Sequence, residues 1–294
     1  EPVMKRVAEL TEQARSEVLG GGLKALIVCS GKPNSFIAGA DVAAIQAVED
    51  PALGEEGARY GQHIFAGLGG LPIPTVAAIH GICLGGGLEM SLACDHRVAS
   101  DHPKTKLGLP EVMLGILPAW GGTTRLPRLV GLQASLDMML TGKQVSASRA
   151  LRMGLVDRVL PAPIFHEKVA EFTRGLLAEE SPVPKKSRRF LSRLLDGTPP
   201  GRAIVLRTAR KQVMSKTGGH YPAPLAILDV LSDSLQEPVD VALQREAKAA
   251  GELIVSRVSK NLVHVFYLRE ATKKTNGTNS EYVEIKRVDR LGVL

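Results

Sequence analysis

Three consecutive glycines precede a glutamate within residues 74–95, and this combination could support acid–base chemistry on a carbonyl compound. Consecutive glycines let the backbone turn sharply and bring bare N–H groups close to a ligand. If a helix begins within Gly85-Gly86-Gly87, its first N–H groups have no internal partner and can hold a developing oxyanion. Glu89 lies about one helical turn after Gly86, so we expect its carboxylate beside whatever those amides hold.

A second acidic residue stands alone in the apolar segment 107–122. Pro110 fixes the backbone immediately before Glu111, which is the only charged side chain of the segment. A carboxylate among apolar neighbours is disfavoured in its charged form. Glu111 is therefore a second candidate acid or base.

Each of these features has a simpler structural explanation when taken alone. A glycine run is more often a plain turn between a strand and a helix. A glutamate after a proline is usually a first-turn residue favoured by the helix dipole. We expect His80 to be a packed core histidine rather than a base, and Trp120 to line the core or a pocket.

Strands and helices alternate in the sequence around these residues. Short apolar runs predict buried strands at 23–29, 76–79 and 96–99, and an edge strand at 156–160. Apolar spacing and caps predict helices at 3–18, 41–47, 55–68 and 88–93, and a helical stretch over 121–154 that is broken at Pro127, Gly131 and Gly142. After about Pro182 the chain is polar and basic, then mainly helical, notably over 241–268. This order implies an α/β fold with parallel strand pairing.

The composition excludes several classes of protein. With 294 residues, 44% of them hydrophobic, the chain can bury a sizeable core in one or two domains. No apolar run approaches the roughly 18 residues that a spanning helix needs. Cys29, Cys83 and Cys94 have apolar neighbours and no paired spacing, so we expect buried free thiols and neither a disulfide framework nor a metal site.

The net charge of +7 includes a basic cluster at residues 185–189. A basic surface can attract nucleic acid, anionic lipid or a polyphosphate ligand, although a solvated helix face is the simpler explanation. Aromatic residues make up only 4% of the chain, which is too few for a stacking platform on single-stranded nucleic acid. We therefore expect no nucleic-acid partner.

Several motifs, taken together and in order, resemble the crotonase, or enoyl-CoA hydratase/isomerase, superfamily. They are FIAGAD at 36–41, GGGLE at 85–89, LPE at 109–111, GGTTRL at 121–126, LTG at 140–142 and ALRMGLVD at 150–157. Their order and spacing agree with the family over about residues 23–160. The resemblance implies an α/β fold of the crotonase type, a spiral of ββα turns, followed here by a C-terminal helical extension.

The resemblance also implies roles for individual residues. The N–H groups of Ala40 and Gly86 would form the oxyanion hole for a thioester carbonyl, and Glu89 and Glu111 would be the two catalytic carboxylates of a hydratase. The carbonyl of Ala38 would meet the adenine of coenzyme A. The remaining substrate-binding positions would be Gly39, Asp41 and Gly85. Acyl-CoA would be the substrate, with no metal and no cofactor needed. Many stand-alone hydratases carry a lysine where this chain has Ala43, so the residues that hold the coenzyme A phosphates stay unassigned.

The flanking segments resemble the α-subunit of multifunctional fatty-acid oxidation complexes. The similar stretches are SGKP at 30–33, HYPA at 220–223 and REAKAAGEL at 245–253. This resemblance predicts an N-terminally truncated hydratase domain at 1–188, a helical extension and linker at 189–275, and at 276–294 a connector and first strand of a Rossmann-type dehydrogenase. NAD would serve only that missing domain, because the chain has no GxGxxG turn.

The same resemblance implies partners and a location. A thiolase β-subunit would bind the full-length enzyme, and a homo-oligomer is the alternative. The location would be the cytoplasm of a bacterium, or the mitochondrion if the chain is eukaryotic. Neither the resemblance nor the residues indicate which acyl chain length the enzyme would prefer.

Three functional hypotheses follow. The first is an enoyl-CoA hydratase of fatty-acid β-oxidation that converts trans-2-enoyl-CoA to 3-hydroxyacyl-CoA, with Δ3,Δ2-enoyl-CoA isomerisation as a second activity. The second is another acyl-CoA enzyme of the superfamily, an isomerase or a thioester hydrolase. The third is a non-catalytic acyl-CoA-binding or RNA-binding module, because a fold alone does not fix function. The presence of both glutamates argues against the third.

Overall fold

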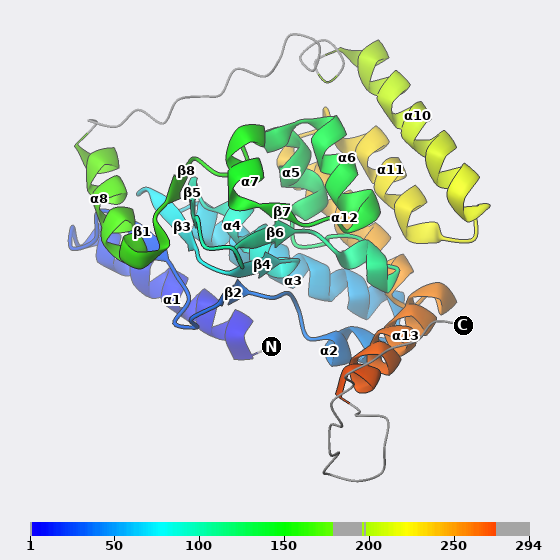
Figure 1. The fold of residues 1–294 in the computed structure, drawn as a ribbon, viewed down its shortest axis with the longest axis horizontal. Helices are drawn as coiled ribbons and strands as arrows, with labels where there is room; N and C mark the ends of the chain where they lie inside the picture. The colour runs from blue at the N-terminus through cyan, green and yellow to red at the C-terminus, as the bar shows by residue number, and fades with distance from the viewer. Residues whose placement is uncertain (1, 179–195, 197, 275–294) are drawn as a thin grey trace, which may run out of the picture.

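The computed structural model describes residues 2–178, 196 and 198–274. The predicted domain boundary at 188, the basic cluster at 185–189 and the connector and strand at 276–294 lie outside the described residues. Within them, eight short strands form two four-stranded sheets (Figure 1). The first sheet is parallel throughout and contains, in spatial order, β1 (Leu26–Val28), β3 (Thr75–Ile79), β5 (His96–Ser100) and β8 (Arg158–Leu160). The second contains β2 (Ser35–Ile37), β4 (Ile82–Leu84), β6 (Lys106–Gly108) and the antiparallel β7 (Val145–Ser146).

The chain alternates between the two sheets as it advances. β1 and β2, β3 and β4, and β5 and β6 are successive pairs with one strand in each sheet, and each pair is followed by helical structure. This is the ββα spiral that the resemblance implied. The strands predicted at 23–29, 76–79, 96–99 and 156–160 are confirmed as β1, β3, β5 and β8. The second strand of each pair was not predicted, because three residues are too few to show a period.

A glycine makes the corner between β3 and β4. Gly81 has φ +78°, and a Cβ at this position would lie 2.1 Å from the carbonyl oxygen of Asn34. Only glycine fits this left-handed backbone with a neighbouring chain so close. The corner directs the chain from the first sheet into the second, toward the segment that carries Glu89.

Helices surround both sheets. The N-terminal ones are α1 (Pro2–Leu19), α2 (Val42–Ala47), α3 (Pro51–Gly69) and α4 (Gly86–Ala93). The central ones are the 3-10 turn η1 (Glu111–Leu114), α5 (Gly122–Val130), α6 (Leu132–Thr141), α7 (Ala147–Met153), η2 (Ala162–Ile164) and α8 (Phe165–Leu177). The C-terminal extension contains α10 (Pro199–Thr217), α11 (Pro222–Ser234), α12 (Val239–Ile254) and α13 (Arg257–Lys274).

One predicted helix break is wrong. α5 continues through Pro127 to Val130, so the proline does not break it. Pro127 lies inside the helix and is buried with Leu126 and Val130, and this apolar packing offsets the single lost backbone hydrogen bond. The stretch predicted to be mainly helical over 241–268 is confirmed as parts of α12 and α13, and the hydroxyl of Ser256 between them accepts the N–H of Ser259 at 3.1 Å.

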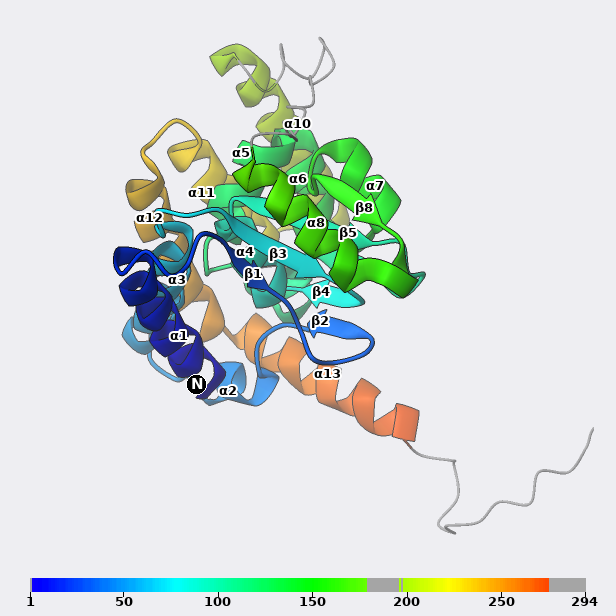
Figure 2. The same cartoon turned by 90° about the vertical axis from the view of Figure 1, so that its left-hand side faces the viewer.

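One large buried cluster joins the sheets to the C-terminal extension. It includes strand residues such as Ala77 and Cys83 together with Ile227 of α11 and Leu253 of α12. A smaller cluster lies where α8 covers the other side of the first sheet (Figure 2). The extension therefore packs on the spiral as part of the same core, while the far end of α13 leads away from it.

All three cysteines are free, as predicted. Cys83 and Cys94 are buried, but Cys29 is exposed just beyond β1, so the prediction of a buried thiol was wrong there. Cys29 follows the last residue of an edge strand, and only one neighbouring strand covers it. Among the described helices, none combines the length and the apolar character that crossing a bilayer would require.

Candidate active site

Three adjacent parallel strands of the second sheet end at one edge and deliver the predicted residues there. β2 pairs with β4 and β4 pairs with β6, all in parallel. The residues that follow them are 38–41, 85–86 and 109–111. The carboxyl ends of parallel strands are where α/β folds assemble ligand sites. The fold thus gathers the three motifs that lie far apart in the sequence.

The glycine turn after β4 contacts both neighbouring loops. Gly85 has φ +54°, and a Cβ there would lie 2.8 Å from Oε1 of Glu111 and 3.4 Å from Cα of Gly39. Its N–H donates to the carbonyl of Gly108 at 2.9 Å. Gly86 is the first residue of α4, so its N–H has no acceptor within the helix. The turn can therefore present a backbone donor at the point where the three loops meet.

The loop after β2 supplies the other predicted donor. Gly39 has φ +110°, a left-handed conformation that turns the chain toward Ala40. Asp41 caps α2, and its side chain accepts the N–H of Ala43 at 2.9 Å. The carboxylate of Asp41 thus fixes the end of this loop. Ala38 and Ala40 are exposed beside it.

Glu89 is buried, with 3% of its surface exposed. Its Oε1 accepts the N–H groups of Trp120 at 2.7 Å and Gly122 at 2.8 Å. Burial raises the pKa of Glu89 well above its ordinary value, and the negative charges of Glu111 and Glu246 raise it further. The two amide hydrogen bonds act in the opposite direction and favour the ionised form.

Glu111 opens the turn η1 and is half-buried. Its Oε2 is buried and has no hydrogen-bond partner among the described residues. Burial raises the pKa of Glu111 to about 8, and the charge of Glu246 contributes in the same direction. The turn is fixed from behind by the extension, since the hydroxyl of Tyr221 donates to the carbonyl of Val112 and that of Ser259 donates to Leu114 at 2.9 Å.

The two carboxyl groups form an interacting pair. The negative charge of Glu111 is among the causes that raise the pKa of Glu89. Each of two carboxyl groups that interact in this way disfavours the ionised form of the other. The pair can therefore supply one acid and one base in the same site, which is what addition or removal of water at a double bond requires.

Sequence reasoning missed a third buried carboxylate, Glu246 of α12. It is fully buried and accepts the N–H of Gly121 at 2.6 Å and the N–H of Thr124 at 2.7 Å. Burial raises the pKa of Glu246 to about 7. No local pattern marks this residue, because its partners lie more than 100 positions earlier in the chain. In the sequence it belongs to the REAKAAGEL stretch, which points to the resemblance but not to a site.

Trp120 lines this region, as predicted. A Cβ on Gly86 would lie 2.7 Å from Cζ3 of the indole, so the ring packs directly on the first residue of α4. The ring also contacts Phe65 edge-on, with centroids 5.7 Å apart, and its Nε1 donates to the carbonyl of Gly57 at 3.3 Å. The indole thereby locks the glycine turn against α3.

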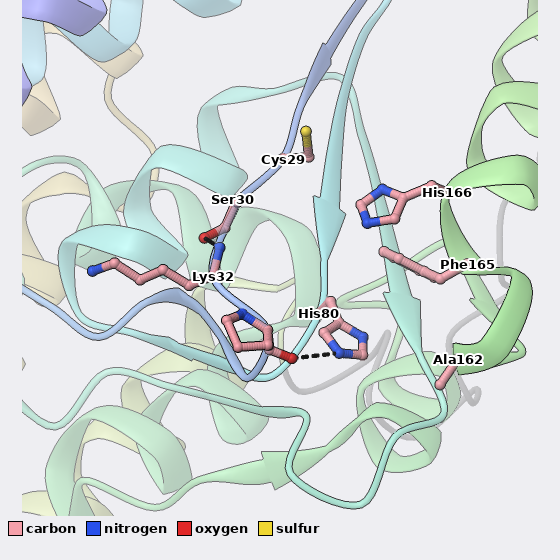
Figure 3. A pocket seen from close by; sticks show the side chains of 9 residues that line it. Cys29, Ser30, Lys32, His80, Ala162, Phe165 and His166 are labelled. Atoms are coloured by element: carbon pink, nitrogen blue, oxygen red, sulfur yellow. Dashed lines mark hydrogen bonds between the residues drawn. The ribbon is translucent and has the colours of Figure 1, made fainter.

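His80 lies away from the paired carboxylates and has a structural role. It follows the carboxyl end of β3, a central strand of the first sheet, and lines a separate pocket together with Cys29, Lys32 and His166 (Figure 3). Its Nδ1 is 2.9 Å from the hydroxyl of Ser100, and its Nε2 is 3.0 Å from the carbonyl of Pro33. Both ring nitrogens have polar partners, but His80 is half-buried and lines a pocket, so the prediction of a core histidine was wrong.

Comparisons with known proteins agree with this α/β spiral. Residues 13–219 match the family model described as enoyl-CoA hydratase/isomerase, and the chain belongs to that family. The chain is 44% identical over 286 residues to the fatty acid oxidation complex subunit alpha of Shewanella loihica, covering 97% of this chain and 40% of the relative. It is 46% identical over 272 residues to the subunit of the same name from Vibrio vulnificus, covering 92% and 38%. The chain spans about two fifths of the length of these curated relatives.

Solved structures show the same fold. An enoyl-CoA hydratase from Bacillus anthracis is 25% identical with a TM-score of 0.56, over 92% of this chain and 86% of the other. Another from Geobacillus kaustophilus is 28% identical with a TM-score of 0.56, over 90% and 84%. The human mitochondrial delta3-delta2-enoyl-CoA isomerase, at 20% identity, has a TM-score of 0.62 over 92% and 90% and shows likeness of fold alone.

Proposed function

We propose that this chain is an enoyl-CoA hydratase that adds water to trans-2-enoyl-CoA in fatty-acid β-oxidation. The observation that carries the proposal is the interacting pair of Glu89 and Glu111 beside the first amide of α4, which has no acceptor within the helix. Family membership and relatives named fatty acid oxidation complex subunit alpha support it. Isomerisation needs only one base, so the presence of two carboxyl groups favours hydration as the main activity.

The proposed reaction uses each part of the site. The N–H groups of Ala40 and Gly86 hold the thioester oxygen, where negative charge develops as an enolate. The oxygen of a water molecule bonds to C3 while one carboxylate takes a proton from that water. The other carboxyl group gives its proton to C2. One water is added across the double bond, the thioester stays intact and no electrons are transferred, so the reaction needs no redox cofactor.

The hydrogen bonds of the two carboxyl groups indicate which of them is more easily ionised before substrate binds. Two backbone amides stabilise charge on Oε1 of Glu89, whereas Oε2 of Glu111 has no partner among the described residues. As far as hydrogen bonding is concerned, the ionised form is better stabilised at Glu89 than at Glu111. Around them, we propose that Ala38, Gly39, Asp41 and Gly85 contact the acyl-CoA, as the resemblance implies.

The length of the curated relatives extends the proposal to the whole protein. We propose a division into a hydratase domain at 1–188, a helical extension and linker at 189–275, and the start of a dehydrogenase domain at 276–294. The name of the relatives denotes a complex, and we propose a thiolase β-subunit as the partner of the full-length enzyme. The proposed location is the cytoplasm, on the basis of the bacterial relatives.

The proposal is tested by following the ultraviolet absorbance of the conjugated thioester with crotonyl-CoA and with a longer 2-enoyl-CoA. We expect turnover by the wild-type protein and a decrease in kcat of about 100-fold or more for Glu111→Gln, since a positioned acid or base contributes at least that much. Glu56→Gln is the matched control, because Glu56 is exposed on α3. Equal turnover by Glu111→Gln and the control would remove Glu111 from the mechanism.

A further inference from the structure

The turn at residues 119–124 is held by two buried carboxylates at once. Glu89 accepts the N–H groups of Trp120 and Gly122, and Glu246 accepts those of Gly121 and Thr124. Donors from neighbouring residues thus alternate between a carboxylate of α4 and a carboxylate of α12. The conformation that directs two amides at Glu89 is the same one that directs two others at Glu246.

We propose that Glu246 is a positioning residue of the active site, which fixes the 119–124 turn so that its amides hold the catalytic carboxylate of Glu89. The inference rests on the proposed hydratase function. Glu246 lies on α12, beyond residue 219, where the match to the family model ends. The C-terminal extension therefore completes the site as well as the core.

The hydrogen bonds of Glu246 require a carboxylate. Oε1 accepts from Gly121 at 2.6 Å and from Nε2 of Gln62 at 3.4 Å, while Oε2 accepts from Thr124 at 2.7 Å. Both oxygens thus face N–H donors. A glutamine has only one acceptor oxygen, so its NH2 group would face a backbone N–H and lose that hydrogen bond.

Gln62 and Arg125 tie the same turn to its surroundings. The Nε2 of Gln62 donates to the carbonyl of Ala119 at 2.9 Å and to that of Leu243 at 3.0 Å, which joins α3, the turn and α12. Nη1 of Arg125 donates to the carbonyl of Trp120 at 3.1 Å. The turn is therefore fixed on its carbonyl side too, and the loss of Glu246 would leave its amide side held by Glu89 alone.

The charges around Glu246 couple it to the acid–base pair. The titratable groups that interact with it are Glu89 on α4, Glu111 on η1, and Arg125 and Arg128 on α5. Its negative charge raises the pKa of both Glu89 and Glu111. Glu246→Gln removes this charge and should lower the pKa values of Glu89 and Glu111. Glu246→Asp keeps the charge nearby and should leave both pKa values nearly unchanged.

Two variants and a control separate geometry from charge. We expect Glu246→Gln and Glu246→Asp each to lower kcat for crotonyl-CoA by about 10-fold to 100-fold, because small displacements in a site have effects of this size, with a smaller change in KM. Only Glu246→Gln should also shift the pH profile of kcat/KM to lower pH. Glu252→Gln, an exposed residue of the same helix, should match the wild type in both. If Glu246→Gln behaves as Glu252→Gln does, the inference is overturned.

A measurement on the wild-type protein covers the case in which a Glu246 variant does not fold. In amide NMR with 15N-labelled glycine and threonine, we expect the N–H groups of Gly121 and Thr124 to exchange slowly with deuterated solvent, since both donate to the buried carboxylate of Glu246. Rapid exchange of both N–H groups would overturn the inference. A wild-type protein without hydratase activity would instead overturn the proposed function, while the exchange rates would still report whether Glu246 holds the turn.

Discussion

The carboxyl group of Glu111 shows how burial sets the chemistry of a single residue. An enclosed oxygen without a hydrogen-bond partner gains little from carrying charge, so the proton stays on and the pKa rises to about 8 from an ordinary 4.5. A carboxyl group that is still protonated near pH 7 can act as an acid. Sequence reasoning reached this property, because Glu111 is the only charged residue in an apolar segment.

The raised pKa of Glu111 makes stability depend on pH. Below pH 4.5 the group is protonated in both the folded and the unfolded chain. Between pH 4.5 and 8 the unfolded chain releases this proton and the folded chain keeps it, so stability is lost as pH rises through this window. The loss is about 1.4 kcal/mol for each pH unit. Glu111→Gln removes it.

The measurement is urea unfolding of the wild type and Glu111→Gln at pH 5, 6.5 and 8. We expect the free energy of unfolding of Glu111→Gln, relative to that of the wild type, to increase as pH increases. The exposed Glu56→Gln should run parallel to the wild type throughout. A constant difference between Glu111→Gln and the wild type would mean that Glu111 is not protonated in the folded protein.

Among the elements, the crossing of α3 and α12 brings the extension onto the spiral. Gly54 of α3 and Gly251 of α12 face each other there. A Cβ on Gly251 would lie 2.4 Å from the carbonyl oxygen of Pro51. The obstacle is backbone, which cannot rotate away as a side chain can. Close approach of the two helices is what allows Glu246 to reach the turn at 119–124.

We expect Gly251→Ala to lower the free energy of unfolding by about 1–3 kcal/mol, because it overpacks this crossing. Gly57→Ala is the control on α3, where a Cβ meets nothing within 4 Å. Alanine favours a helix over glycine, so the control should gain up to about 1 kcal/mol. Denaturant unfolding of both proteins measures the contrast. An equal effect of the two substitutions would show that the helices can separate without cost.

Features set by neighbouring residues could be predicted from the sequence, whereas features set by residues far apart in the chain could not. The strands β1, β3 and β5 lie within the apolar runs at 23–29, 76–79 and 96–99, and the caps at Asp41 and Gly142 are local as well, so these features were predictable. The strands β2, β4 and β6 have three residues each and no comparable apolar run around them, so they were not predicted. Glu246 was missed because its role arises only when α12 packs across α3 and α5. The six motifs placed Glu89, Glu111 and the glycine turn together only through their resemblance to a family.

For the whole molecule, the central feature is convergence. Three strands of one sheet end beside one another, and each contributes one part: a loop with the Ala40 amide, a helix start with the Gly86 amide and Glu89, and a turn with Glu111. Helices from the opposite end of the chain fix these parts from behind. The site is thus a property of the assembled fold rather than of one segment.

The most direct test is a structure of this protein with a bound acyl-CoA that it cannot hydrate, such as acetoacetyl-CoA. We expect the thioester oxygen at about 2.7–3.1 Å from the backbone nitrogens of both Ala40 and Gly86. We also expect C2 and C3 of the acyl group to lie between the carboxyl groups of Glu89 and Glu111. A thioester bound elsewhere, or one whose C2 and C3 face only one of the two carboxyl groups, would contradict the proposed mechanism.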